Sequence, residues 1–247
     1  MYRSIMVFIH VFLLFITLAF SSASAQNPQD ATRVMLSFYS VLYSDIPEWQ
    51  AHYNDNLVPV MEGMVADGSL TGFGVRMHHV GGKYNLRMNL AGTDDTNFEE
   101  VATRIATAAA AKDPEAMERT ERMILSHYDE IWTLGRRNLE APNDAAYVYE
   151  NFFQVNRADV ERWNELWESV LPVFDELMSQ GLMKGYVVEQ HNMGGEYNWK
   201  VLGFFNEWDD IDDAQARFSE SVPLNHEFWT LPIAHKDEIW ARMPEMN

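Results

Sequence analysis

Two copies of one short motif carry most of the residues in this chain that could do chemistry. The first runs from His78 to Asn85 (His-His-Val-Gly-Gly-Lys-Tyr-Asn), and the second, 113 positions later, runs from His191 to Asn198 (His-Asn-Met-Gly-Gly-Glu-Tyr-Asn). Imidazole titrates near neutral pH, so it can act as a general acid or base, and it can also bind a transition metal. The candidate binding residues of these motifs are His78, His79, Tyr84, Asn85, His191, Tyr197 and Asn198.

A second repeated motif adds two further candidate binding residues. His127 and His235 stand 108 positions apart, and each begins a His-x-Asp-Glu-Ile-Trp run that ends at Trp132 or Trp240. We expect the two tryptophans to pack in the core or at a barrel edge rather than to form a substrate platform. Internal repeats of this length predict a chain built from two similar halves.

A structural role is the alternative for these motifs. Both copies keep their residues, and a symmetric pattern is more typical of a folding constraint than of one specialised site. The Gly-Gly pairs lie between two predicted strands and do not precede a helix, so they indicate turns rather than a phosphate-binding loop. Asn85 and Asn198 would fix those turns or face a ligand. His52, His79 and His226 have no histidine counterpart in the other half, and specialisation would show at such positions.

Each half is predicted to follow the element order β-α-β-β-α-β. Runs rich in Val, Phe and Tyr indicate strands, and apolar residues at helical spacing indicate the helices between them. The predicted strands are 33–41, 72–78, 84–90 and 130–134 in the first half, and 147–155, 185–191, 197–204 and 238–242 in the second.

The first long helix of each half should be interrupted or kinked by a proline, at Pro59 and Pro172. Pro59 lies ten positions after Trp49, but Pro172 lies nine positions after Trp163. The first half therefore holds one extra residue near 54–56. A π-bulge would absorb it, and such bulges are frequent at functional sites. A slightly longer irregular turn is the alternative.

This order of elements, with the repeated His-Gly-Gly-Tyr-Asn run, resembles the dimeric α/β-barrel superfamily. The resemblance implies an α+β fold of two tandem ferredoxin-like (βαββαβ) repeats, 32–137 and 146–247, which a linker at 138–145 joins into an intrachain pseudo-dimeric barrel. The superfamily includes small monooxygenases, lyases, isomerases and haem enzymes such as chlorite dismutases, so the fold does not choose the function.

The resemblance also implies which strands meet. The second strand of one half should join the fourth strand of the other, with both ends at the same mouth of the barrel. We therefore expect His78 to approach His235, and His191 to approach His127, within about two strand spacings, or about 10 Å.

The first 25 residues have the features of a secretory signal peptide: Arg3, an apolar run from Ile5 to Phe20, and a small-residue cleavage site ending at Ala25. A membrane anchor is the alternative. Cleavage would place the protein in the periplasm or outside the cell, without a membrane segment. The chain has no cysteine, so it cannot form disulfides. Its net charge of −19 argues against nucleic acid as a partner. A homo-oligomer is compatible with these features.

Three functions are compatible with the sequence, and it does not decide whether the protein is an enzyme. The first is an exported soluble protein that binds or transforms a small, partly apolar molecule in a cavity between the two sheets. The second is a non-enzymatic secreted interaction or structural protein with a filled barrel. The third is a haem or metal binder, although the sequence predicts no cofactor. The acidic residues within 208–213 lack the spacing of a calcium-binding loop.

Overall fold

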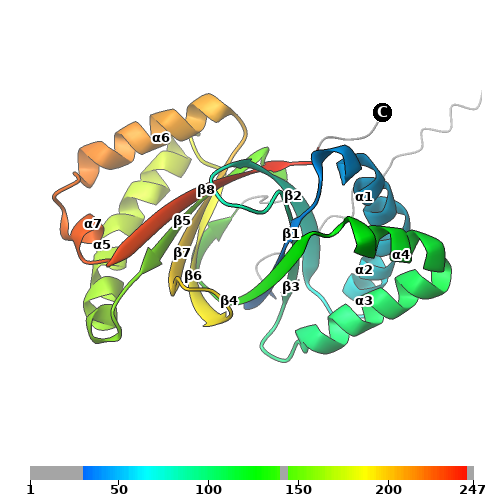
Figure 1. Ribbon diagram of the computed structural model, residues 1–247. Helices are drawn as coiled ribbons and strands as arrows, with labels where there is room; N and C mark the ends of the chain where they lie inside the picture. The colour runs from blue at the N-terminus through cyan, green and yellow to red at the C-terminus, as the bar shows by residue number, and fades with distance from the viewer. Residues whose placement is uncertain (1–29, 140–143, 244–247) are drawn as a thin grey trace, which may run out of the picture.

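The computed structural model describes residues 30–139 and 144–243, and the predicted signal peptide lies outside them. Among the described residues, eight antiparallel strands close into one barrel in the order β1-β3-β2-β8-β5-β7-β6-β4 (Figure 1). The strands are β1 (Arg33–Ser40), β2 (Gly72–Val80), β3 (Leu86–Gly92), β4 (Ser126–Leu139), β5 (Tyr147–Gln154), β6 (Gly185–Met193), β7 (Trp199–Phe205) and β8 (Ala234–Arg242).

Each half of the chain contributes four neighbouring strands to the barrel. The first half supplies β4-β1-β3-β2 and the second supplies β8-β5-β7-β6. Two seams join the halves, one between β2 and β8 and the other between β4 and β6. The predicted joining of the second strand of one half to the fourth strand of the other is therefore confirmed.

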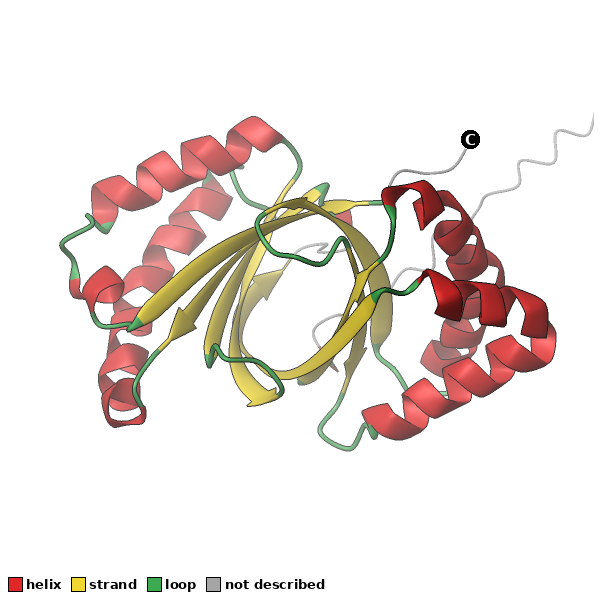
Figure 2. Ribbon diagram, viewed as in Figure 1, coloured by secondary structure: helices red, strands yellow, loops and turns green. Residues whose placement is uncertain are grey.

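The helices lie outside the barrel, in one group on each half (Figure 2). Alternate residues of a strand point to opposite faces, so one set fills the barrel and the other meets the helices. On β1, for example, Leu36 and Phe38 pack inside the barrel, whereas Met35 packs with the helices. The helices are α1 (Ile46–His52), α2 (Val58–Ala66), α3 (Phe98–Lys112), α4 (Pro114–Met123), α5 (Val160–Ser179), α6 (Trp208–Ser221) and α7 (Glu227–Thr230).

The first half has a π-helical turn where the sequence has its extra residue. Residues Tyr53–Leu57 form this turn between α1 and α2, so the predicted π-bulge is confirmed. Pro59 stands at the start of α2, whereas Pro172 lies inside α5, which continues through it to Ser179. Of the two predicted alternatives, an interruption at Pro172 is therefore wrong, and a kink there stays a prediction.

The fourth strand of the first half is longer than predicted. It continues to Leu139, so the first two residues of the expected 138–145 linker belong to the sheet. Residues 140–143 lie outside the described part of the chain, and Ala145 is fully buried. The strand is extended because β6 pairs with it as far as Leu139.

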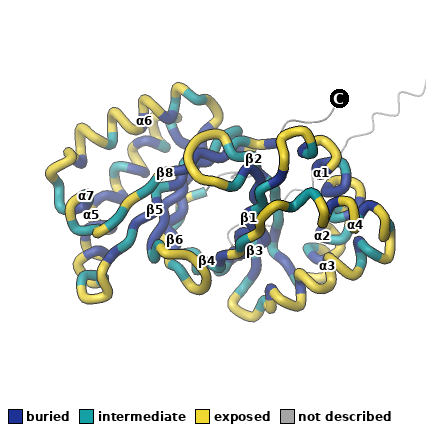
Figure 3. The backbone as a smooth tube through the Cα atoms, viewed as in Figure 1, coloured by how far each residue is buried: buried dark blue, intermediate teal, exposed yellow. Residues whose placement is uncertain are grey.

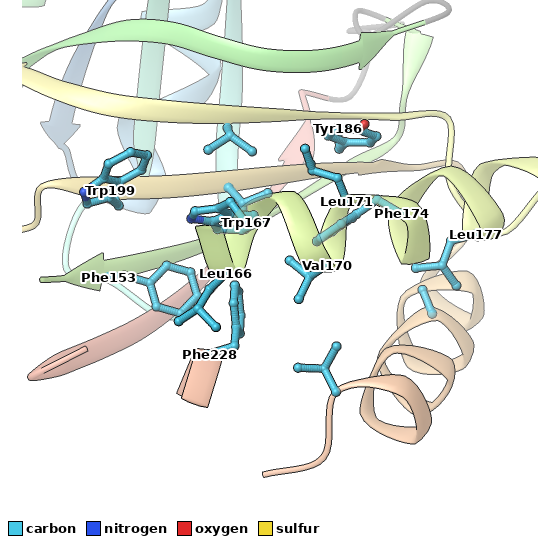
Figure 4. Close-up of a cluster of buried hydrophobic side chains, with 14 of the residues drawn as sticks. Phe153, Leu166, Trp167, Val170, Leu171, Phe174, Leu177, Tyr186, Trp199 and Phe228 are labelled. Carbon is cyan, nitrogen blue, oxygen red and sulfur yellow. The ribbon is translucent and has the colours of Figure 1, made fainter. Parts of the chain in front are cut away.

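The second half has a core rich in aromatic side chains between the sheet and α5 (Figure 4). Trp163, Trp167 and Phe228 pack around Phe153 of β5, with ring centroids 5.1–6.2 Å apart. Along the whole described chain, buried residues lie mainly on the strands and exposed residues lie on the outer faces of the helices (Figure 3).

The Gly-Gly turns lie at the two seams and press against the opposite half. Gly81 and Gly194 have φ angles of +93° and +91°. A Cβ atom at Gly81 would lie 2.5 Å from the carbonyl oxygen of Asp237, and one at Gly194 would lie 2.5 Å from that of Asp129. The predicted turn role is therefore confirmed, and glycine is required there by both φ and the close approach.

Candidate functional site

Cavities lie both outside the barrel and within it. The first cavity, about 530 Å³, lies in the first half between the outer face of the sheet and the helices. The second cavity, about 290 Å³, occupies the corresponding place in the second half. The barrel cavity, about 240 Å³, lies between the two sheets, where the sequence predicted the ligand. The larger spaces are thus between sheet and helices.

A histidine–aspartate pair lies on the sheet side of the first cavity. His127 and Asp129 are two residues apart on β4, so both side chains point to the helix-facing side of the sheet. His127 Nε2 lies 2.9 Å from Asp129 Oδ1. The imidazole also stacks on Tyr39 of β1, with ring centroids 4.7 Å apart and planes at 8°. Burial raises the pKa of Tyr39 to about 12, so its hydroxyl stays protonated. The His127 ring is therefore oriented for proton transfer or for a hydrogen bond.

A second histidine lines the first cavity from the helix side. His52 ends α1, directly before the π-helical turn, and is 6% exposed. Its Nδ1 lies 3.1 Å from Asn56 Nδ2, while Nε2 is buried without a hydrogen-bond partner among the described residues. With the amide nitrogen donating to Nδ1, the neutral ring carries its proton on Nε2. Burial lowers the pKa of His52, and Arg119 adds to this effect against the opposing charge of Asp113.

We expect His52 to make the protein less stable in mild acid. Its folded-state pKa lies below its unfolded value, so the unfolded chain binds more protons as pH falls below about 6.5. The free energy of unfolding should decrease from pH 7 to pH 5 with a steeper slope in the wild type than in His52→Gln. Urea denaturation at several pH values measures both slopes, and equal slopes would contradict the lowered pKa.

The second cavity repeats the histidine–aspartate pair in a different setting. His235 Nε2 lies 2.9 Å from Asp237 Oδ1 and 3.2 Å from Asn151 Oδ1. The ring stacks on Phe153, with centroids 4.8 Å apart. Burial and the nearby Asp237 carboxylate raise the pKa of Tyr149, which hydrogen bonds to that carboxylate. The polar groups here mainly satisfy one another, and no second histidine joins His235 among the described residues that line this cavity.

The predicted approach of His78 to His235 is wrong. His78 pairs with Trp240 on β8, five positions from His235, which corresponds to about 17 Å along the strand. The imidazole meets the Trp240 ring edge-on, with centroids 5.5 Å apart. In addition, even-numbered residues of β8 such as Trp240 face the barrel, whereas His235 faces the helices.

The predicted approach of His191 to His127 fails in the same way. His191 pairs with Trp132 across the β4–β6 seam, five positions from His127, and its ring contacts the Trp132 ring edge-on at 5.5 Å. Both tryptophans are at most 1% exposed, so their predicted core role is confirmed. His78 and His191 thus point into the barrel, away from the first and second cavities.

The two motif asparagines fix the ends of neighbouring strands. Asn85 accepts from the Val41 amide at 3.0 Å and donates to the Val41 carbonyl at 2.7 Å. Asn198 makes the same pair of bonds to Val155, both at 2.8 Å. Each side chain is thus engaged at both of its polar atoms, and it holds the end of a neighbouring strand rather than the Gly-Gly turn that the sequence predicted.

The remaining candidates from the motifs contact aromatic rings. Tyr84 and Tyr197 pack with the aromatic cluster inside the barrel, 5.8 Å from Phe38 and 5.9 Å from Phe152 respectively. His79 lies outside the barrel, with its ring 5.1 Å from Trp208. The described residues that line the first cavity do not include any of these three.

The barrel interior contains buried ion pairs that sequence reasoning missed. Arg87 pairs with Glu150, and Lys200 Nζ lies 2.8 Å from Glu189; all four side chains are at most 4% exposed. Burial opposes ionisation of Glu150, but the charges of Arg87 and Lys200 outweigh it and hold its pKa below the usual value. The repeat contained one signal: Arg87 and Lys200 are equivalent positions, 113 residues apart.

Each of these two cations also lies over a motif tryptophan. Arg87 is 4.7 Å from the Trp240 ring, and Lys200 is 4.6 Å from the Trp132 ring. Within the described residues, no three histidine, aspartate or glutamate side chains converge as a metal ion would require. The helices in the described part of the chain are too short or too polar to cross a membrane.

No protein-family model and no curated protein matches the sequence. Solved structures do match the fold. A protein from Lactobacillus acidophilus described as a monooxygenase has a TM-score of 0.59 at 11% identity, covering 85% of this chain and 93% of its own. One from Fusobacterium nucleatum with the same description has a TM-score of 0.59 at 8% identity, covering 85% and 92%. A heme-binding protein from Thermus thermophilus has a TM-score of 0.54 at 13% identity, covering 87% and 92%. The chain therefore has the fold of the dimeric α/β-barrel superfamily, closed within a single polypeptide.

Proposed function

We propose that this protein binds, and transforms by proton transfer, a small, largely apolar molecule in the first cavity. The observation that carries the proposal is the oriented His127–Asp129 pair facing a cavity of about 530 Å³ that His52 also lines. Pockets for small molecules are typically apolar with a few placed polar groups, and this cavity has that character.

The polar groups define the ligand more closely. His52 offers a buried donor at Nε2 that has no partner among the described residues, so a carbonyl or hydroxyl oxygen of the ligand would satisfy it. His127 would exchange a proton with that oxygen or with a second polar group of the ligand. Glu99 and Glu121 also line the cavity, and their carboxylates favour a neutral ligand over an anion.

The first cavity is the better candidate because the two halves differ there. The second cavity is smaller, its histidine lies near both Asp237 and Asn151, and the position matching His52 is Leu166. The π-helical turn, a feature often associated with function, begins at the residue after His52. Proteins of this fold described as monooxygenases or as heme-binding support a small-molecule role for the fold in general.

Calorimetric titration with 2-naphthol, a neutral probe with an apolar body and one hydroxyl, tests the proposal. The wild type should bind it, and His127→Ala should weaken binding at least about tenfold, because a ligand hydrogen bond is lost. His235→Ala is the matched control, since it removes the equivalent histidine of the second cavity, and it should bind like the wild type. Equal losses in both variants, or no binding by the folded wild type, would refute the first cavity as the site.

We further propose that the two halves are tandem ferredoxin-like units and that the chain is exported. The strand orders β4-β1-β3-β2 and β8-β5-β7-β6 support the first statement, because they are the same order counted within each half. The apolar run before Ala25 supports the second. N-terminal sequencing of the protein from its native host should begin at Gln26, and a retained leader would contradict export by cleavage.

A further inference from the structure

We propose that the second cavity is a separate binding site for a small organic cation, namely a quaternary ammonium group on a short body. This inference goes beyond the proposed function, since it concerns a charged ligand in the second half of the chain and uses none of the residues that line the first cavity. Three features of the cavity wall support it: aromatic rings, one negative charge, and polar atoms that already have hydrogen-bond partners.

Aromatic side chains line much of the second cavity. Phe218 lies 5.9 Å from both Phe228 and Trp229, measured between ring centroids, and the last two lie 5.1 Å apart. Phe153 joins the group at 5.5 Å from Phe228 (Figure 4). These four rings come from β5, α6 and α7, and all of them line the cavity. Because the face of an aromatic ring carries partial negative charge, a group of rings of this kind attracts a cation.

A single carboxylate, that of Asp237, gives the wall of this cavity its charge. No lysine or arginine is found among the described residues that line it. The carboxylate accepts hydrogen bonds from His235, whose Nε2 lies 2.9 Å from Oδ1, and from the hydroxyl of Tyr149. A neutral imidazole and a phenol donate hydrogen bonds without adding positive charge, so the carboxylate keeps its negative charge. A cation in the cavity would offset that charge.

The polar atoms buried in this wall already have partners, which narrows the class of cation. His235 Nε2 also lies 3.2 Å from Asn151 Oδ1, and the Trp229 indole nitrogen donates to the Val222 carbonyl at 3.0 Å. Among the described residues that line the cavity, no buried side-chain nitrogen or oxygen is without a hydrogen-bond partner, in contrast to His52 Nε2 in the first cavity. A primary ammonium group must donate hydrogen bonds when it is buried, whereas a quaternary ammonium group has none to donate. The wall therefore favours a quaternary ammonium group, which ring faces and charge are sufficient to bind.

The test is calorimetric titration of the protein with choline and with 3,3-dimethylbutan-1-ol, which has nearly the same shape but a carbon atom in place of the charged nitrogen. We expect choline to bind at least about tenfold more tightly than the alcohol, because the rings and the carboxylate attract only the charged ligand. Asp237→Asn keeps the shape of the side chain and should weaken choline binding about threefold or more. Trp229→Leu should weaken choline binding more than binding of the alcohol, because it removes a ring face. Circular dichroism establishes that each variant is folded.

A matched control and an NMR signal show whether choline binds in the second cavity rather than elsewhere on the protein. Asp129→Asn changes the equivalent residue of the repeat, which lines the first cavity, and should leave choline binding unchanged. Choline should shift the ¹³C methyl signal of Met183, which lines the second cavity, and leave that of Met117 in the first cavity in place.

Four results would each overturn the inference of a cation site. They are no binding of choline, equal binding of choline and the alcohol, wild-type choline affinity in folded Asp237→Asn, and an equal loss of affinity in Asp129→Asn. If neither variant of the second cavity folds, the comparison of the two ligands and the Met183 signal of the wild type decide.

Discussion

Replacing Glu150 by alanine should lower the free energy of unfolding by about 3–5 kcal/mol, a large part of the stability of a typical domain. Glu150 is fully buried in the barrel and pairs with Arg87, whose side chain is 4% exposed. Without the carboxylate, the guanidinium stays buried with its partner charge removed. Urea denaturation monitored by tryptophan fluorescence measures the change.

A surface ion pair provides the matched control for this prediction. Arg122 and Glu118 lie one turn apart on α4 and are more than half exposed, so Glu118→Ala should cost only about 0–1 kcal/mol. The double variant Arg87→Met/Glu150→Leu removes both buried charges together and should recover much of the lost stability. A Glu150→Ala cost as small as that of Glu118→Ala would mean that the pair does not support the barrel.

Gly194→Ala should destabilise the protein by more than about 2 kcal/mol, because two costs combine there. The residue has a φ of +91°, and a Cβ would lie 2.5 Å from the carbonyl oxygen of Asp129 on the other half. Relief of that clash would push the β6–β7 turn away from β4 and open the seam. Because Gly194 also lines the first cavity, ligand binding should weaken as well.

Gly68 separates these two costs. It has a similar φ of +81°, but a Cβ there would meet nothing within 4 Å. Gly68→Ala should therefore show only the backbone cost, about 1–2 kcal/mol. Thermal unfolding of both variants gives the comparison, and an equal loss of stability would show that the close approach at the seam has no energetic weight.

The repeat made the two halves predictable, and the resemblance to the dimeric α/β-barrel superfamily implied which of their strands meet at the seams. The unequal Trp–Pro spacing predicted the π-helical turn at Tyr53–Leu57. These features follow from the order of the motifs and from residue spacings along the sequence, and they do not depend on the direction in which a single side chain points.

The partners of the histidines were not predictable in the same way. Which face a strand residue points to changes with every position, and a shift in the pairing of two strands moves a side chain by several ångströms. The stagger of the closed barrel sets His78 opposite Trp240 and leaves His127 and His235 on the helix side. The only sequence signal for His52 was that the second half has no histidine at the equivalent position.

The buried charges of the barrel escaped sequence reasoning for a related reason. Lys200 is the one charged residue of the otherwise apolar strand β7, and Glu189 begins the polar end of β6, next to Gln190, where a solvated position would be expected. In the structure both side chains are buried in the barrel interior, because the opposite sheet covers it. Only the closure of the two halves on each other turns these residues into a buried network.

The most direct test of a ligand site in the first cavity is NMR of methionine methyl groups labelled with ¹³C. Met117 and Met193 line the first cavity, whereas Met183 lines the second. Titration with 2-naphthol should shift the Met117 and Met193 signals in proportion to occupancy and leave the Met183 signal in place. A shift of Met183 alone, or no shift at Met117 and Met193 when binding is saturated, would contradict the assignment of the first cavity as the functional site.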